Sequence, residues 1–296
     1  MDGCPPTLSE LLRRRARERP DQEALVYPAF AHGGAAVRLT YAQLDARADE
    51  LAAGLIVLGL EKGEHVALWA ANVPDWVPLQ FALARIGAVL VTVNTALARD
   101  ELAFVLRQSR AVAVLHTTRT GSNEASRSLD ELLLADDPAV ARLRHRVWLP
   151  THPHDEPAMG VGPGHGVGAL HSLHALAERG RSLAPEALAA REAACRPDDV
   201  VNIQYTSGTT GTSKGVMLSH ANVLGSGATL GALLGTTPAD RVAMVVPLFH
   251  CFGCVVCVLG AYIHGATLCC IPAFDPGDAL RLVDEEKCTL LHGVPT

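Results

Sequence analysis

Residues 205–220 read YTSGTTGTSKGVMLSH, a run that carries hydroxyl side chains, glycines and one lysine more densely than an ordinary surface turn requires. Its two glycines, Gly208 and Gly211, allow the backbone to take positive φ and to bring its N–H groups close to a ligand. Lys214 adds a movable positive charge, and the hydroxyl groups add hydrogen-bond donors. The run therefore predicts a phosphate-binding loop, made of Thr206, Ser207, Gly208, Thr209, Thr210, Gly211, Thr212, Ser213 and Lys214.

A flexible linker and the nucleotide loop of P-loop NTPases are the two alternatives for this run. A linker does not normally sit between an apolar strand, here residues 200–205, and a helix, which starts near His220. A P-loop requires four residues between its glycines and a Ser or Thr after its lysine. Here only two residues separate the glycines and Gly215 follows Lys214. The spacing excludes a P-loop.

Composition and charge restrict the class of protein. The chain has 296 residues and is 49% hydrophobic, which is enough to bury a large core in one domain or two. A net charge of −6 and a pI near 6.1 disfavour a nucleic-acid-binding protein, because such proteins carry a basic face. These values are typical of a cytosolic enzyme, so we expect a cytoplasmic protein that binds no nucleic acid.

The N-terminal region combines three leucines, at positions 8, 11 and 12, with five arginines between positions 13 and 19. This combination could mark a mitochondrial transit helix, and it keeps the mitochondrion open as an alternative compartment. The acidic residues Asp2, Glu10 and Glu18 oppose that reading, since transit peptides avoid acids. We therefore predict the first amphipathic helix of the folded domain.

The longest apolar stretch, residues 242–263, approaches the length of about 20 residues that a membrane-spanning helix needs. Pro247, His250 and Gly253 interrupt the stretch. Such breaks are typical of a buried strand, a turn and a helix rather than of one continuous span. The sequence therefore predicts no transmembrane segment here.

Three of the eight cysteines are spaced three residues apart, at positions 251, 254 and 257, and could belong to a metal or redox protein. A ferredoxin-like run would need another cysteine at position 261 followed by proline, but Ala261 and Tyr262 stand there. Free cysteine commonly behaves as a small buried hydrophobe. We interpret these thiols as core residues and predict no metal-ligating set.

Strand-like and helix-like segments alternate over residues 37–115, a pattern that favours a parallel sheet covered by helices. Thr40 and Gln43 are spaced as a capping box at the first helix of this region. The further expected elements are the strand His65–Trp69, a helix opened by Asn72 and Pro74 that ends at Arg85, the strand Ala88–Val93, the helix Asp100–Ser109 and the strand Ala111–Leu115.

The alternation resumes after residue 200. The expected strands are Val200–Tyr205, Val242–Val246, Ala266–Ile271 and Thr289–His292, and the expected helices start near His220, at Phe252 and, capped by Asp275, at Pro276. The intervening residues, 117–199, are less regular, and we predict a long loop with helical islands near Leu129 and Ala187. The expected division is a sheet half over 37–116, an irregular connection over 117–199 and a phosphate-loop half over 200–296.

The run at 205–220 resembles the core signature of the adenylate-forming superfamily, which includes acyl-CoA synthetases, firefly-type luciferases and the adenylation domains of peptide synthetases. One departure is Ser213, where the family usually has proline, and it affects the stiffness of the loop. NIQYTSGTTG and PLFHCFG resemble most closely the medium-chain acyl-CoA ligases of the acyl-CoA synthetase family member 2 type. Further segments similar to acyl-CoA synthetases begin at Leu39 (LTYAQLDARADELAAGL), Val66 (VALWAANVPDW), Arg85 (RIGAVLVTVNTALARDELAFVL), Pro247 (PLFHCFG) and Gly265 (GATLCCIPAFDPGDALRLVDEEKCTLLHGVPT).

The resemblance implies an ATP-dependent ligase that converts a fatty acid, of medium chain length, to acyl-AMP and then to acyl-CoA, with magnesium assisting and CoA as cosubstrate. It also implies that His250 and Phe252 line the junction between the acyl pocket and the adenylate. Lys214 would neutralise the phosphates or hold the loop shut by a salt bridge.

The family continues with a Tyr-Gly-x-Thr-Glu segment, a ribose-binding aspartate, a hinge and a small C-terminal domain that carries the adenylation lysine. None of these is found in the 296 residues. We therefore expect an incomplete N-terminal AMP-binding domain of α/β class, with mostly parallel sheets flanked by helices. We expect this chain alone to lack full activity. A non-catalytic nucleotide- or acyl-binding remnant is the alternative, and the sequence leaves acyl chain length and oligomeric state open.

Overall fold

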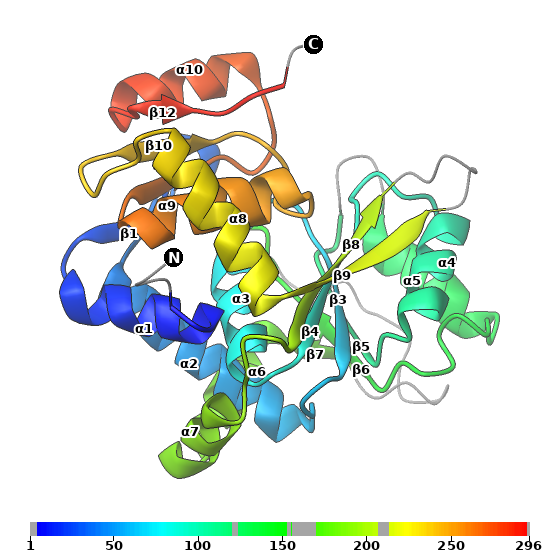
Figure 1. The fold of residues 1–296 in the computed structure, drawn as a ribbon. Coiled ribbons are helices and arrows are strands. Elements are labelled where there is room, and N and C mark those ends of the chain that lie inside the picture. Colours follow the sequence, from blue (N-terminus) through cyan, green and yellow to red (C-terminus); the bar gives the residue numbers. More distant parts are fainter. Residues whose placement is uncertain (1–4, 120–123, 153–154, 156–169, 207–212, 295–296) are drawn as a thin grey trace.

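Two β-sheets, with helices between and around them, make up the molecule in the computed structural model (Figure 1). The structure describes residues 5–119, 124–152, 155, 170–206 and 213–294. Strands and helices alternate along most of the chain, and most neighbouring strands are parallel. This arrangement confirms the predicted α/β class.

The larger sheet has seven strands in the order β7-β6-β5-β3-β4-β8-β9. Its strands are β3 (His65–Trp69), β4 (Val89–Thr92), β5 (Ala113–His116), β6 (His145–Trp148), β7 (Leu170–Ser172), β8 (Val200–Thr206) and β9 (Lys214–Ser219). All neighbouring pairs are parallel except β8 and β9, which form an antiparallel hairpin at one edge.

The smaller sheet has five strands in the order β12-β10-β11-β1-β2. Its strands are β1 (Glu23–Tyr27), β2 (Val37–Thr40), β10 (Arg241–Met244), β11 (Thr267–Cys270) and β12 (Leu290–Leu291). The strands from the C-terminal third pair in parallel with one another and with β1, and β2 is antiparallel to β1. The first and last parts of the chain therefore build one sheet together.

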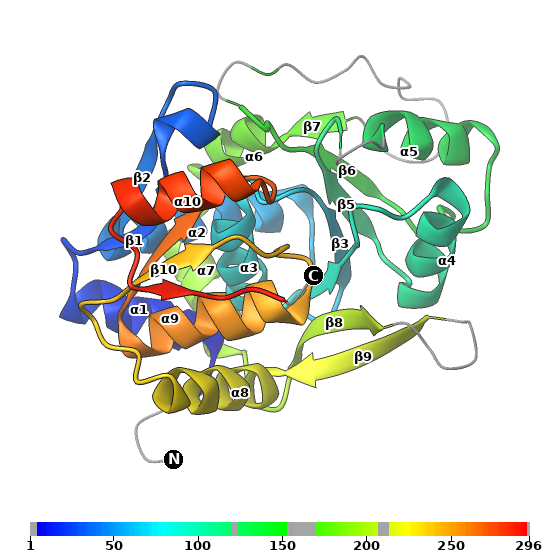
Figure 2. The same cartoon turned by 90° about the horizontal axis from the view of Figure 1, so that it is seen from above.

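Ten α-helices and a π-helix lie within the described residues. They are α1 (Leu8–Glu18), α2 (Tyr41–Leu58), α3 (Trp76–Arg85), α4 (Arg99–Ser109), α5 (Ala125–Leu134), α6 (Leu173–Gly180), α7 (Pro185–Ala193), α8 (His220–Leu233), the π-helix Phe252–Cys257, α9 (Val258–His264) and α10 (Pro276–Glu285). Figure 2 shows α4 and α5 on one side of the seven-stranded sheet and α2 and α3 on the other.

The alternation of side chains along β3 explains these layers. Ala67 and Trp69 pack with α4 and α5, whereas Val66 and Leu68 belong to the main core that contains α2 and α3. Because successive strand residues point to opposite faces, a strand covered on both faces must be apolar throughout. Every residue of α3 is buried, since this helix lies in the core shared by both sheets.

Local signals in the sequence placed several helix ends correctly. Thr40 and Gln43 form the predicted capping box, with Gln43 N donating to Thr40 Oγ1 at 3.2 Å and Thr40 N donating to Gln43 Oε1 at 2.9 Å. Asp275 caps α10 as predicted, accepting from Asp278 N at 2.9 Å. The amphipathic N-terminal helix is α1, whose leucines are buried.

The apolar stretch 242–263 is divided as predicted, into β10, a turn, the π-helix and most of α9. Within the described residues, no helix has the length and apolar character that a bilayer crossing requires.

The prediction of a long loop between two sheet halves was wrong for the described parts of residues 117–199. This segment contains α5, β6, β7, α6 and α7, and the predicted islands near Leu129 and Ala187 are α5 and α7. β6 and β7 extend the same sheet that β8 and β9 join. Short strands followed by polar stretches carry little periodicity, and strand partners far apart in sequence are decided by packing rather than by local pattern.

Candidate functional site

The β8–β9 hairpin holds the two ends of the predicted phosphate loop. Thr206 and Lys214 are opposite each other at the last register pair of the hairpin, and both are exposed. Ser207, Gly208, Thr209, Thr210, Gly211 and Thr212 lie outside the described residues, so their part in ligand binding stays a prediction. The run over residues 214–219, which the sequence did not identify as a strand, is β9. The antiparallel pairing fixes the neck of the loop at the edge of the seven-stranded sheet (Figure 1).

A cavity of about 640 Å³ opens beside this neck. Thr206 and Ser213 line it together with side chains from α4 and from the loop before the π-helix. The complete lining is Thr92, Asn94, Leu97, Asp100, Glu101, Phe104, Val105, Gln204, Tyr205, Thr206, Ser213, Phe249 and His250. The cavity lies at the carboxyl ends of the parallel strands β4 and β8, which is where ligands bind in open α/β sheets.

His250, predicted from the sequence to line the acyl and adenylate junction, is in this cavity. The backbone N–H of Phe252 donates to His250 Nδ1 at 3.1 Å. A neutral imidazole that accepts at Nδ1 carries its proton on Nε2, so His250 can donate one hydrogen bond to an oxygen. The structure therefore brings the loop neck and a histidine donor to one cavity.

Phe252 has a different environment from His250. Its ring centroid is 6.1 Å from that of His292, and it packs partly buried against the main core. Phe249, rather than Phe252, lines the cavity. The predicted contact between Phe252 and an acyl group stays a prediction.

The model of the AMP-binding enzyme family matches residues 12–296. The chain belongs to the AMP-binding enzyme family. It is 39% identical, over 98% of its length, to the putative acyl-CoA synthetase YngI of Bacillus subtilis, and 33% identical to the mitochondrial medium-chain acyl-CoA ligase ACSF2 of Mus musculus. Its fold matches the N-terminal domain of FACL13 from Mycobacterium tuberculosis with a TM-score of 0.77, at 30% identity over 98% of this chain and 63% of that one.

The chain spans about half the length of these curated relatives, 51% of the Bacillus protein and 46% of the mouse protein. The AMP-binding signature, the hairpin neck and the cavity all lie within this half. The resemblance deduced from YTSGTTGTSKG is thereby confirmed at the level of the family.

Asn72 has a structural role that the sequence pattern did not indicate. Its Nδ2 donates to Val246 O at 3.0 Å and to Ile271 O at 3.3 Å, and its Oδ1 accepts from Leu248 N at 2.8 Å. We predicted Asn72 and Pro74 as the opening of a helix, but α3 begins at Trp76. Asn72 instead joins the end of β3 to the ends of β10 and β11, immediately before the loop that carries His250.

We expect Asn72→Ala to lower the free energy of unfolding by about 2 kcal/mol, because it leaves buried backbone groups of Val246 and Leu248 without partners. Chemical denaturation of both proteins measures the difference. Asn94→Ala is the matched control. The Asn94 side chain is exposed and, in the described part of the chain, accepts one local bond, from Ala96 N, so its loss should cost well under half as much. Equal losses in the two variants would contradict this role of Asn72.

His220 ties the helix that follows the hairpin to the N-terminal helix. It is buried, and its Nδ1 accepts a hydrogen bond from the backbone N–H of Leu8 at 3.1 Å. Burial lowers the pKa of His220 to about 4, from an ordinary value of 6.5. The folded protein therefore keeps this imidazole neutral, and protonation of Nδ1 would remove the acceptor that Leu8 uses.

The pH dependence follows from this shift in the pKa of His220. Because the unfolded chain binds a proton at higher pH than the folded chain, this stabilisation is complete above a pH of about 6.5 and is lost as pH falls toward about 4. We expect a loss of about 2 kcal/mol between about pH 7 and about pH 5. His220→Gln keeps an acceptor for Leu8 and cannot titrate, so thermal denaturation should show a smaller loss. His116, whose pKa burial lowers to about 3, contributes equally to both proteins.

The prediction that Cys251, Cys254 and Cys257 are core residues is confirmed for Cys254 and Cys257 and is wrong for Cys251, which precedes the π-helix at the surface. Cys254, Cys257, Cys269 and Cys270 are buried, and Cys251 is exposed. Burial raises the pKa of Cys257 to about 12, so that thiol stays protonated. Within the part of the chain that the structure describes, no group of three or more His, Cys, Asp or Glu side chains is placed to hold a metal ion.

Proposed function

We propose that the protein carrying this chain is an ATP-dependent acyl-CoA ligase that activates a fatty acid of medium chain length. The observation that supports this most strongly is the position of Thr206 and Lys214. They form the neck of a hydroxyl-rich loop whose Thr206 and Ser213 line the same cavity as His250, in a chain matched by the AMP-binding family over residues 12–296.

The proposed reaction has two steps. An oxygen of the fatty carboxylate attacks the α-phosphorus of ATP, the bond to the bridging oxygen of pyrophosphate breaks, and acyl-AMP forms. The thiol of CoA then attacks the acyl carbon, AMP leaves, and the thiol proton passes to solvent. Magnesium, when bound with ATP, neutralises charge on the phosphates.

The residues of this chain contribute binding, orientation and charge. Loop hydroxyls and backbone N–H groups over 206–213 hold the β- and γ-phosphates, and Lys214 stabilises the negative charge on the pyrophosphate leaving group. The Nε2–H of His250 donates to one carboxylate oxygen and directs the other toward phosphorus. Positioning and electrostatic stabilisation together account for most of the catalysis in enzymatic phosphoryl transfer, and the same two contributions are proposed here.

A direct test combines MgATP, CoA and a series of fatty acids in a coupled assay of pyrophosphate release. We expect octanoate to be used by the protein that carries this chain in preference to acetate and palmitate. No pyrophosphate release with any fatty acid from that protein would contradict the ligase proposal, and release with palmitate or acetate alone would contradict the medium-chain assignment.

A non-catalytic nucleotide- or acyl-binding remnant of such a ligase is the alternative. We expect the 296-residue polypeptide by itself to lack full activity. Robust turnover by that polypeptide would contradict this expectation, and absence of MgATP binding in calorimetry would favour the remnant over a ligase.

The proposed partners are small molecules: a fatty acid, ATP and CoA. We propose the cytoplasm as the compartment, with the mitochondrion as the alternative that the mitochondrial mouse relative supports. A C-terminal fluorescent fusion that colocalises with a mitochondrial marker would overturn the cytoplasmic assignment.

A further inference from the structure

A second, much smaller cavity lies behind the site, between β8, α3 and the π-helix. Its volume is about 10 Å³, close to the minimum that one water molecule occupies. Most of its lining is apolar, and two amide side chains complete it. The lining residues are Leu8, Gln80, Leu90, Val201, Asn202, Val223 and Val255.

The two amides are buried and only partly hydrogen-bonded. Asn202 is 4% exposed and Gln80 is 5% exposed. Among the residues that the structure describes, none is a hydrogen-bond partner of Asn202 Nδ2, Asn202 Oδ1 or Gln80 Oε1. If the oxygen and nitrogen of the Asn202 amide were exchanged, both atoms would still lack a partner. The lack of hydrogen bonds therefore does not depend on how the amide is oriented. A buried polar atom without a partner costs about 1–3 kcal/mol.

We propose that this cavity is a binding site for one structural water molecule, held by Asn202 and Gln80. One water molecule can give each of these three atoms one hydrogen bond. Its two O–H groups donate to Asn202 Oδ1 and Gln80 Oε1, and its oxygen accepts from Asn202 Nδ2. Three hydrogen bonds are typical of buried water in proteins.

The lining disfavours other small ligands. A cation would need a compensating charge, and none of the seven lining residues carries a carboxylate. The end of an acyl chain needs apolar contact on all sides, but it would leave the same three amide atoms unpaired. The volume also admits a single heavy atom rather than a chain.

The water would connect β8, which leads into the phosphate loop, to the π-helix that follows His250. Gln80 Nε2 donates to Cys254 O at 3.1 Å, in the π-helix, and Gln204 Nε2 lies 3.2 Å from Cys254 Sγ. Gln80 therefore bonds a turn of the π-helix, and Asn202 is on β8, four residues before Thr206. A water shared by both amides fixes the spacing of β8 and the π-helix, and π-helical turns frequently occur at functional sites.

A crystal structure of the 296-residue chain at about 1.6 Å resolution tests the site directly. We expect one compact density peak at about 2.7–3.2 Å from Asn202 Nδ2, Asn202 Oδ1 and Gln80 Oε1. Elongated density, or amides that have rotated to bond each other with no peak, would overturn the proposal. This result does not depend on the ligase activity, so the two proposals can fail separately.

The variant Asn202→Val gives a second test through the sign of the change in Tm. If water satisfies the amides, the variant loses these bonds and leaves Gln80 Oε1 unpaired, and Tm falls by about 2–6 °C. If the amides are unpaired in the wild type, valine removes two unsatisfied atoms from a strand and Tm rises. Ser219, at the far end of the hairpin, offers the control Ser219→Thr, which keeps a capping hydroxyl and should leave Tm nearly unchanged. An unchanged or raised Tm in Asn202→Val would overturn the proposal.

Discussion

Acyl-adenylate formation falls by about 100- to 1000-fold when Lys214 is replaced by alanine, if the proposed function holds. The structure places Lys214 opposite Thr206 at the neck of the loop. From this position its ammonium group can stay in contact with the negatively charged pyrophosphate as it leaves. In enzymes, removing one preorganised hydrogen-bond donor to a charge that develops in the transition state raises the activation free energy by about 3–4 kcal/mol. Single-turnover measurement of acyl-AMP in the protein that carries this chain gives the rate.

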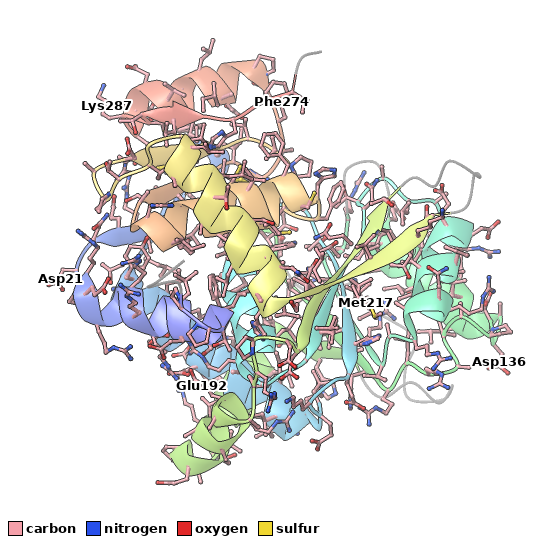
Figure 3. The ribbon with its side chains drawn as sticks, viewed as in Figure 1. Asp21, Asp136, Glu192, Met217, Phe274 and Lys287 are labelled. Carbon is pink, nitrogen blue, oxygen red and sulfur yellow. The ribbon has the colours of Figure 1, made fainter. Side chains whose placement is uncertain are left out.

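Lys287→Ala is the matched control for Lys214→Ala. The Lys287 side chain is 79% exposed, and within the described residues its ion pair is with Asp284 on α10. Figure 3 shows Lys287 at the outer end of α10, on the opposite side of the molecule from Met217 of β9. The control should retain the wild-type rate. If Thr209, Thr210 and Lys214 could all be replaced by alanine without loss of ATP affinity and thioester synthesis, we would withdraw the ligase assignment.

The second large effect is expected on stability, at the buried Arg85 of α3. Its guanidinium is fully buried and contacts two carboxylates, Asp45 Oδ1 at 2.6 Å and Asp49 Oδ1 at 2.6 Å, both on α2. Nε donates to Ser9 Oγ of α1 at 2.9 Å, and Ser9 also bonds Glu192 at the end of α7. Arg85 therefore joins four helices through one side chain.

We expect Arg85→Ala to lower the free energy of unfolding by about 3–5 kcal/mol, because removing one partner leaves uncompensated charges in a partly buried cluster. Arg13, which also bonds Asp45, Asp49 and Glu192, keeps part of the cluster neutral and limits the loss. Urea denaturation of both proteins measures the difference.

Arg127→Ala is the control for this charge effect. The Arg127 side chain is 73% exposed and forms an i,i+4 pair with Glu131 on α5, a type of contact that contributes about 0.3–0.5 kcal/mol. A loss in Arg85→Ala no larger than that in Arg127→Ala would show that the buried cluster does not stabilise the four-helix contact. Glu192 is labelled in Figure 3, beside α7 and below α1, where the cluster ends.

Local sequence signals were sufficient for single elements. The strand His65–Trp69 has the predicted bounds, and the Thr40–Gln43 capping box and the Asp275 cap start their helices as predicted. These signals succeed because each depends on residues within one turn or one strand. The start of α3 that Asn72 and Pro74 predicted lies a few residues before the observed start at Trp76, because the Asn72 amide bonds Val246 O and Ile271 O instead of capping the helix.

The pairing of strands that are far apart in the chain could not be predicted from local sequence signals. The sequence suggested two sheet halves separated by a loop, but β8 pairs with β4 and β1 pairs with β11, across more than 100 and more than 200 residues. The Asn72 amide is another example, since its partners Val246, Leu248 and Ile271 belong to distant segments. A short apolar strand carries no local mark of its partner.

The sequence by itself determined the family and the α/β class. It also predicted the residues of a phosphate loop, because a dense run of glycine, hydroxyl and lysine side chains is a local chemical pattern suited to binding phosphate. Only the tertiary structure decided that Thr206 and His250 share one cavity, that Arg85 joins four helices, and that Asn202 and Gln80 face one small cavity. These contacts bring together residues from distant parts of the chain. They form because both sheets bury apolar side chains against α3 in one core.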